Sequence, residues 1–189
     1  MFKLSDELGM LRDTVRNFAA EKIAPYADEW DMKHYFPYQE AVKPMGELGF
    51  FGTVIPEEYG GNNMGWLAAM IITEEIARAS SSLRVQVNMQ ELGCAFTILR
   101  YGSEELQKKY IPGLVNADIL GAFAITEPQA GSDVVAIKST AEDKGDHWLI
   151  NGTKTWISNA TIGDINVFYA YTDRSKGAAG LSAFIVELK

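Results

Sequence analysis

Two short segments carry residues whose types and spacing suit ligand chemistry. In residues 122–136, AFAITEPQAGSDVVA, an apolar run ends at Ile125 and the polar segment TEPQAGSD follows. This change predicts a strand that ends in a loop where hydroxyls and free backbone N–H groups gather. In residues 151–159, NGTKTWISN, the Asn-Gly pair predicts a hairpin turn whose outgoing strand carries Trp156 and Ser158. We call these segments the first and second motif; the alternative is that both are ordinary turns of a β domain.

A third candidate is a row of polar residues on a helix. Residues 82–101 are apolar nearly all round, which predicts a buried helix, yet Arg84, Asn88 and Glu91 recur at i, i+4 and i+7 on one face. A buried arginine costs several kcal/mol unless it is paired. The row is therefore either an internal network, such as Arg84 with Glu91, or the wall of a cavity for a polar or anionic ligand.

Composition and motif searches exclude several other functions. The net charge of −8 argues against nucleic acid as a partner, because phosphate binding needs clustered Lys and Arg. His34 and His147 lie far apart and have no Cys or carboxylate cluster at ligand spacing, so no metal site is expected. A G-x-S-x-G elbow, a P-loop and the Rossmann fingerprint are all missing. The sequence predicts no hydrolase of that type and no dinucleotide site of the Rossmann kind.

The same sequence features predict a cytoplasmic protein. No apolar run approaches the roughly 20 residues that span a bilayer, and a helix pattern follows Met1 almost directly, which predicts no signal or transit peptide. The single cysteine, Cys94, excludes an internal disulfide and fits a reducing compartment.

The elements that must position these residues fall into two classes, which predicts an α+β protein of two domains. Helical spacing covers the first two-thirds: a helix capped by Ser5 that stops before Pro25, and helices over residues 36–49, 66–78, 82–101 and 103–112. Alternation then predicts strands over 119–126, 135–143, 147–150, 154–158, 166–171 and 181–187, with hairpin turns at 144–146 and 151–152. The domains are predicted as 1–116, helical, and 117–189, β, with the last strand lacking a closing element, so that the chain is expected to be cut short.

Both motifs, together with GELGFFGTVIPEEYGG, TEEIAR and YGSEELQKKYIPGL, resemble the acyl-CoA dehydrogenase family over essentially the whole chain. The resemblance implies an all-α N-terminal domain followed by an antiparallel β-barrel-like domain, with a C-terminal helical domain beyond Lys189. It implies FAD as the cofactor and α,β-dehydrogenation of an acyl-CoA, with electrons passed to an electron-transfer flavoprotein. It also implies a homotetramer, and it places the catalytic base, usually a glutamate, beyond Lys189.

The resemblance also assigns roles to residues. Phe123, Ile125 and Thr126 are expected along the isoalloxazine ring, and Gly131 and Ser132 near the FAD pyrophosphate and the CoA thioester arm, where a glycine permits close approach. Trp156 is expected on the flavin face opposite the substrate, and Ser158 near N5 and O4. The cofactor-binding set is therefore Phe123, Ile125, Thr126, Gly131, Ser132, Trp156, Ile157 and Ser158. Phe123 and Ile125 have the alternative of packing the β domain only.

The substrate is the finer question. The register of Ser81-Ser82-Leu83-Arg84 is similar to that of the glutaryl-CoA dehydrogenases, in which an arginine here pairs with the distal carboxylate, so Arg84, Asn88 and Ser132 are the expected substrate-binding residues. Within that group the sequence most resembles the non-decarboxylating enzymes of anaerobic bacteria; the decarboxylating members resemble it less and have a carboxylate where this chain has Ala77. Glu91 leaves alternatives open: it pairs with Arg84, and the substrate is a monocarboxylic acyl-CoA, or it is the base for an alicyclic acyl-CoA. An acyl-CoA oxidase, a flavin monooxygenase and a non-catalytic chain are the further alternatives.

Overall fold

The computed structural model describes residues 3–188, and the chain divides into two compact units, Met1–Ile119 and Leu120–Lys189. We call them the helical unit and the β unit and describe each by itself. The sequence places the boundary at Asn116. In the structure the next three residues stay with the helical unit, because Lys43 forms an ion pair with Asp118 and the Gln90 amide donates to the carbonyl of Ile119 at 2.7 Å.

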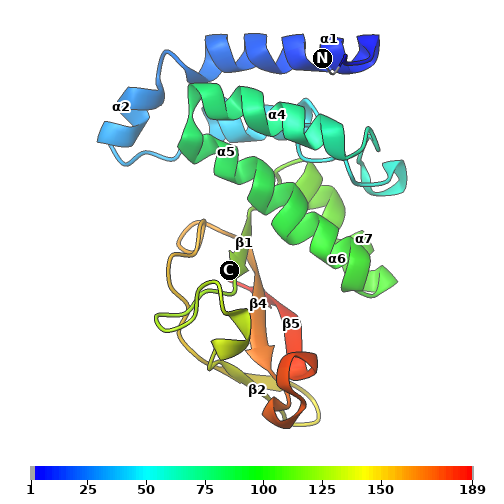
Figure 1. Cartoon of the computed structure of the whole chain (residues 1–189), viewed down its shortest axis with the longest axis vertical. Coiled ribbons are helices and arrows are strands. Elements are labelled where there is room, and N and C mark those ends of the chain that lie inside the picture. The colour runs from blue at the N-terminus through cyan, green and yellow to red at the C-terminus, as the bar shows by residue number, and fades with distance from the viewer. Residues whose placement is uncertain (1–2, 189) are drawn as a thin grey trace. The chain divides into compact units, whose positions relative to one another are not determined.

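The helical unit is a set of packed helices. Helices α1 and α4 lie side by side, and α4 also packs on α5 (Figure 1). Ser5 accepts a hydrogen bond from the backbone N–H of Leu8 at 3.3 Å, which confirms it as the N-cap of α1. Its elements are α1 (Asp6–Phe18), η1 (Ala19–Ile23), α2 (Ala27–Met32), η2 (Tyr38–Val42), α3 (Lys43–Glu47), η3 (Glu57–Tyr59), α4 (Trp66–Ala79), α5 (Ser81–Val87), η4 (Asn88–Ala95), α6 (Phe96–Tyr101) and α7 (Glu104–Val115).

The long helix predicted over residues 82–101 is a composite of three segments. Helices α5 and α6 are joined by η4, a π-helical segment, in which each backbone N–H bonds to the carbonyl five residues earlier. Its buried side chains form a single stripe: Leu83, Gln86, Val87, Gln90, Glu91, Cys94, Ala95 and Ile98. Glu91 belongs to that stripe, whereas Arg84 and Asn88 lie half-buried at its edge. The helix is therefore buried on one side only.

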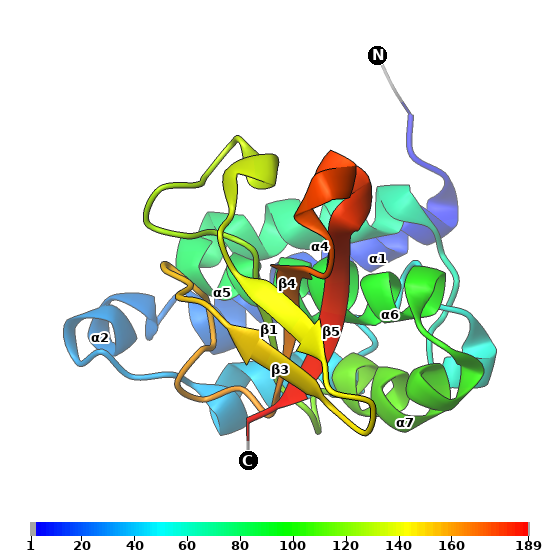
Figure 2. The ribbon, with the colours of Figure 1, turned by 90° about the horizontal axis from the view of Figure 1, so that it is seen from below.

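The β unit contains a mixed sheet, not the wholly antiparallel one that was expected. Its strands are β1 (Gly121–Ala124), β2 (Thr140–Asp143), β3 (Trp148–Asn151), β4 (Ile165–Tyr171) and β5 (Leu181–Glu187). The order is β1-β4-β2-β3, with β5 on β4; β1 and β2 pair parallel to β4, and the β2–β3 and β4–β5 pairs are antiparallel (Figure 2). Parallel strands need a long crossover connection. The segment between β1 and β4 contains β2, β3, the second motif and all of the first motif beyond Ala124.

The predicted turns have different outcomes. The β2–β3 hairpin is confirmed, with Gly145 at φ +94° and the Lys144 N–H donating to the His147 carbonyl at 2.9 Å. The hairpin predicted at Asn151-Gly152 is wrong: β3 ends at Asn151, and residues 152–158 form no strand. Several strands are also shorter than predicted, whereas β5 has the predicted bounds of 181–187.

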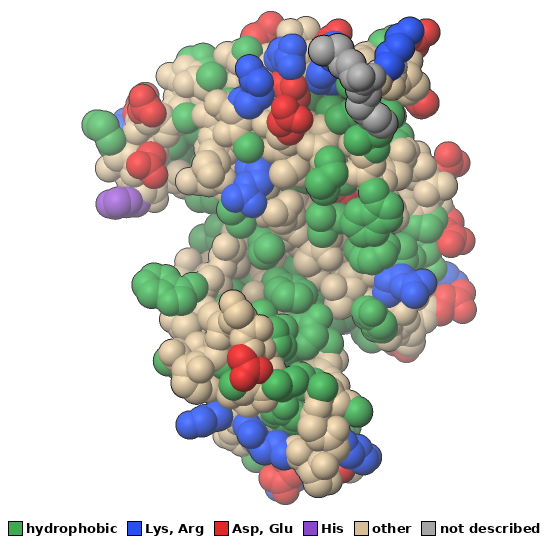
Figure 3. Space-filling view, viewed as in Figure 1, with side chains coloured by type: hydrophobic (Ala, Val, Ile, Leu, Met, Phe, Trp, Pro, Cys, Tyr) green, Lys and Arg blue, Asp and Glu red, His purple; other side chains and the backbone are tan. Residues whose placement is uncertain are grey.

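Large apolar side chains reach the surface of both units (Figure 3). In the helical unit they include Trp66, Met70 and Tyr101, and Trp66 packs edge-on against Phe96 with ring centroids 5.0 Å apart. In the β unit Trp156 is 91% exposed.

Candidate functional site

The second motif lies along the first, antiparallel to it. The Thr155 N–H donates to the Thr126 carbonyl at 3.0 Å, and the Asn159 side-chain amide donates to the Gly121 carbonyl at 2.9 Å. The end of β1 and the loop after it are thereby held against the second motif. The structure brings together two segments that are about 30 residues apart in the sequence.

The second motif is not a strand because its backbone turns twice into the left-handed region. Asn159 has φ +64°, which asparagine tolerates, but Trp156 has φ +59°, which is an outlier for a bulky residue. The strand predicted over 154–158 is therefore wrong. The left-handed backbone leaves the Trp156 indole projecting from the β unit, and strained residues of this kind cluster at ligand sites.

Glu127 is the centre of the contact between the motifs. Its carboxylate accepts hydrogen bonds from the backbone N–H groups of Lys138 at 2.6 Å and Ser139 at 2.9 Å, and from the side chains of Gln129 and Ser139. The fifth partner is Lys154 of the second motif, whose ammonium lies 2.9 Å from Oε1. Burial alone would raise the pKa of Glu127, but the bonds from Ser139, Lys138 and Lys154 outweigh it and hold the pKa well below its usual range.

Sequence reasoning missed Glu127 and Lys154 as site residues. The side chain of Glu127 is 3% exposed and that of Lys154 is 5% exposed, and the Lys154 ammonium also donates to the Ile125 carbonyl at 3.0 Å. Two charges buried at this depth cost several kcal/mol each unless both are paired and hydrogen-bonded. The available signal was a single base, Lys154, in the second motif and two acids, Glu127 and Asp133, in the first, but it does not reveal which acid meets the base.

The predicted cofactor residues in the β unit occupy three places. Phe123, on β1, packs its ring 5.1 Å from that of Tyr169, so at least part of its role is structural. Ile125 and Thr126 are half-buried beside the second motif. Gly131 and Ser132 lie exposed on the loop of the first motif, and Trp156, Ile157 and Ser158 lie on the second.

These residues leave room and bonding capacity for a ligand. A Cβ built on Gly131 meets no atom within 4 Å, so the backbone there is open to close approach. Among the described residues the hydroxyls of Thr126, Ser132 and Ser158 have no hydrogen-bond partner. An exposed planar aromatic, an open glycine loop and three uncommitted hydroxyls together suit a flat, polar-edged molecule that carries anionic groups.

In the helical unit, Arg84 and Glu91 do not form the predicted internal pair. The Glu91 Oε1 accepts from the Thr53 hydroxyl and from the Val54 N–H, both at 2.8 Å. Within residues 3–188 the Arg84 guanidinium forms no ion pair. Arg84 is therefore half-buried with its charge available, and Asn88, one turn along, is also half-buried.

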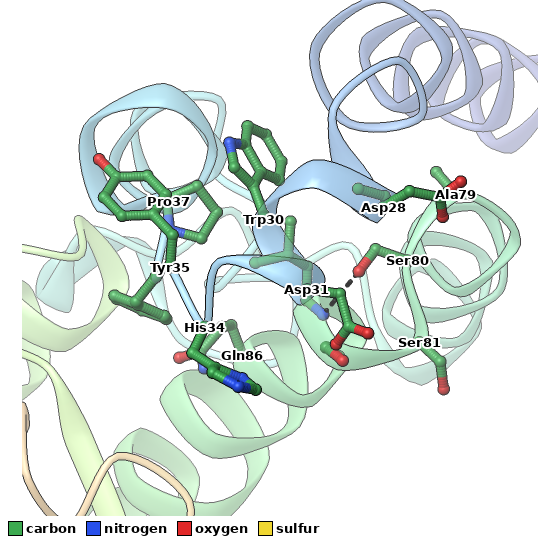
Figure 4. Close-up of a pocket in the computed structure, with 14 residues that line it drawn as sticks. Asp28, Trp30, Asp31, His34, Tyr35, Pro37, Ala79, Ser80, Ser81 and Gln86 are labelled. Carbon is green, nitrogen blue, oxygen red and sulfur yellow. Dashed lines mark hydrogen bonds between the residues drawn. The ribbon is translucent and has the colours of Figure 1, made fainter.

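The cavity expected beside the polar row lies elsewhere on the same helix. A cavity of about 480 Å³ is lined by Ser81, Ser82, Leu83 and Gln86 on one side and by residues from 27–37 on the other. Figure 4 shows His34, Asp31 and Ser80 around it, and Arg84 is not among its lining residues. None of Arg84, Asn88 and Glu91 lines this cavity, and their expected role as one cavity wall stays a prediction.

The burial of Glu91 argues against the alternative role of a base that was expected from the sequence. Its side chain is fully buried, and its Oε2 has no hydrogen-bond partner among the described residues. Desolvation raises the pKa of Glu91 although Val54 and Thr53 donate to it. An enclosed carboxyl group against the 53–54 loop cannot take a proton from a substrate.

The raised pKa of Glu91 predicts a pH dependence of stability. A group whose pKa is higher in the folded state than in the unfolded state makes its full contribution to folding stability at pH values below the unfolded-state pKa. That contribution is lost as pH rises through the folded-state pKa. We therefore expect Glu91→Gln to gain stability relative to the parent as pH rises above the ordinary pKa of a glutamate, as measured by denaturant titrations. As the control, Glu75→Gln should differ from the parent by a constant amount above the ordinary pKa of a glutamate, and that difference should shrink as pH falls below it, because the hydrogen bond from Arg16 lowers the pKa of Glu75. A parent and Glu91→Gln with parallel pH profiles would contradict the assignment.

Two classes of site are absent from the part of the chain that the structure describes. Residues 3–188 contain no group of three His, Cys, Asp or Glu side chains placed to hold a metal ion. Nor does any helix in that range have the length and apolarity to cross a membrane.

Comparison with known proteins agrees with the resemblance seen in the sequence. The family models of the acyl-CoA dehydrogenase N-terminal domain and middle domain match residues 5–118 and 122–189. A glutaryl-CoA dehydrogenase of Desulfococcus multivorans is 68% identical over 188 residues, which are 98% of this chain and 48% of that protein. The chain thus spans about half the length of this relative.

Solved structures give the same assignment. A glutaryl-coenzyme A dehydrogenase in complex with glutaryl-CoA superposes with a TM-score of 0.96 at 67% identity, covering 99% of this chain and 48% of that one. The FAD complex of PigA superposes with a TM-score of 0.92 at 28% identity, covering 99% and 49%. With two domain models matched in series and this level of identity, the chain belongs to the acyl-CoA dehydrogenase family.

Proposed function

We propose that this chain is part of an FAD-dependent acyl-CoA dehydrogenase that converts glutaryl-CoA to glutaconyl-CoA. The observation that carries the proposal is the 68% identity to a glutaryl-CoA dehydrogenase together with an Arg84 whose charge is not consumed by Glu91. A free guanidinium suits the distal carboxylate of a dicarboxylic thioester, to which it can donate two parallel hydrogen bonds. A monocarboxylic or alicyclic acyl-CoA offers it no partner.

The β unit supplies groups that fit FAD. In the proposed site, the Trp156 indole would pack against the ring system, Thr126 and Ser158 would offer hydroxyls to its polar edge, and Gly131 and Ser132 would offer backbone N–H groups and a hydroxyl to the phosphates. Ile125 and Ile157 would provide apolar contacts beside them. When bound, the flavin supplies the hydride-accepting chemistry that these side chains lack.

The residues of this chain then bind and orient the substrate. In the helical unit, Arg84 and Asn88 are the proposed partners of the far end of the acyl group; in the β unit, Ser132 is the proposed partner of the thioester arm. Removal of the α-proton requires a carboxylate base, which Glu91 does not provide. By family resemblance that base, the tetramer contacts and the transfer of electrons to an electron-transfer flavoprotein belong to the whole protein.

One assay tests the proposal. The full-length protein is incubated with glutaryl-CoA and a dye acceptor, and the products are identified by mass. We expect bound flavin, dye reduction and a product lighter than glutaryl-CoA by two hydrogens. Additional loss of carbon dioxide would identify the decarboxylating type. A folded protein without flavin, faster turnover of an alicyclic or monocarboxylic acyl-CoA, or oxygen consumption without the dye would each contradict the assignment.

A further inference from the structure

The Glu127–Lys154 ion pair differs from the surface ion pairs of this chain. In Lys33–Glu29 both side chains are more than half exposed, and such pairs contribute little. Glu127 and Lys154 are enclosed, 2.9 Å apart, and belong to different motifs. A well-packed apolar pair could stabilise a core equally well, so burying two charges here indicates a requirement for a defined geometry.

The bonds of this pair end on the backbone of the proposed flavin site. The Lys154 ammonium donates to the carbonyl of Ile125. The residues that follow these two are also hydrogen-bonded, because the Thr155 N–H donates to the Thr126 carbonyl. Trp156 follows directly with its left-handed backbone. The Lys154 ammonium also lies 4.9 Å from the centroid of the Phe168 ring on β4. It therefore connects the first motif, the second motif and the sheet.

Glu127 extends the same connection to the other end of the first motif. Its backbone exchanges two hydrogen bonds with Ala130, both 3.0 Å, which close the turn just before Gly131. Its carboxylate binds the N–H groups of Lys138 and Ser139, which fixes the point where the chain returns after the loop. The two ends of the Gly131–Ser132 loop are thus held by one residue, the first by the backbone of Glu127 and the second by its side chain.

We propose that Glu127 and Lys154 are positioning residues that hold Thr126, the Gly131–Ser132 loop and Trp156 in the arrangement that binds FAD. This inference depends on the proposed function, because it assumes that FAD is the ligand. Neither side chain needs to touch the cofactor. Their role is to fix the backbone that does, as residues behind metal ligands fix the ligands.

The test uses the full-length protein and four variants. Lys154→Met removes the positive charge and keeps a side chain of similar length. Glu127→Gln removes the negative charge, and Lys154→Arg keeps a positive charge. The matched control is Arg16→Met in the helical unit, because Arg16 donates two hydrogen bonds to Glu75, whose side chain is also 3% exposed. For each we would measure the thermal midpoint of the apoprotein, the FAD dissociation constant and the visible circular dichroism of the bound flavin.

We expect Lys154→Met and Glu127→Gln to weaken FAD binding by about 10- to 100-fold, the range found when residues behind a binding group are removed. Their flavin dichroism should also change. Arg16→Met should lower the apoprotein midpoint but keep the parent dissociation constant and spectrum, and Lys154→Arg should retain most of the affinity.

The inference would be overturned if Lys154→Met kept the FAD affinity and flavin dichroism of the parent while its thermal midpoint fell as in Arg16→Met. The ion pair would then act on stability alone. If Lys154→Met does not fold, Lys154→Arg must bind FAD more tightly than Glu127→Gln, and equal affinities would overturn it. If the parent protein itself binds no FAD, it is the proposed function that fails. If the parent binds FAD and converts glutaryl-CoA, and the variants bind FAD equally well, the proposed function is kept and the positioning role is rejected.

Discussion

Arg84→Ala is expected to lower kcat/KM for glutaryl-CoA by roughly 30-fold to several-thousand-fold while lowering that for butyryl-CoA by less than about tenfold. The larger loss corresponds to about 2–5 kcal/mol, the usual cost of removing one partner of a buried, hydrogen-bonded charge pair. Butyryl-CoA has no distal carboxylate, so its binding does not include that pair. The structure supports this selectivity because Glu91 bonds to Thr53 and Val54, which leaves the Arg84 charge uncommitted.

The measurement is steady-state kinetics of the full-length protein on both thioesters. The control variant is Arg100→Ala, which removes an exposed arginine further along the same helical run and should change neither substrate by more than about twofold. Equal losses on the two substrates in Arg84→Ala would show that the arginine does not read the distal carboxylate. The dicarboxylate assignment would then be withdrawn and the dehydrogenase assignment kept.

Gly152→Ala is expected to destabilise the β unit by about 3 kcal/mol, at the upper end of the usual cost of overpacking. A Cβ at this position overlaps the Ser139 hydroxyl and lies 2.6 Å from its Cβ and 2.9 Å from its Cα. Ser139 cannot move aside freely, because its N–H and hydroxyl both bind Glu127. The variant should therefore also disturb the buried ion pair and lose FAD affinity.

Gly131→Ala is the matched comparison, because its Cβ meets no atom within 4 Å and its φ lies outside the left-handed region. We expect it to keep the thermal midpoint of the apoprotein while weakening FAD binding, since the added methyl group would occupy space that the ligand needs. Denaturant unfolding and FAD titration of the two variants separate the effects. A Gly152→Ala protein as stable as Gly131→Ala would show that the packing at Ser139 is looser than the structure indicates.

Local patterns were sufficient for much of the fold. The Ser5 cap, the Gly145 hairpin and the 181–187 strand were predictable, because each depends on side chains and backbone preferences within a few residues. The helical and β halves were separable for the same reason, since their apolar periods differ. Predictions of features that depend on distant partners were wrong. The strand predicted over 154–158 is prevented by the left-handed backbone of Trp156. The parallel and antiparallel partners of β4 leave no signal in the local sequence.

The same division holds for the candidate site. The sequence by itself determined which residues are candidates for the chemistry: the two motifs, with Thr126, Ser132, Trp156 and Ser158, and Arg84 on its helix. Only the tertiary structure decided how they are held, because the partners of a buried charge are chosen by the fold and not by spacing. Glu91 faces Thr53 and Val54 and not Arg84, although i and i+7 share a helix face, and Glu127 meets Lys154 across the crossover between β1 and β4. A buried charge binds whatever donor the folded chain brings within about 3 Å of it, and no local pattern specifies that donor.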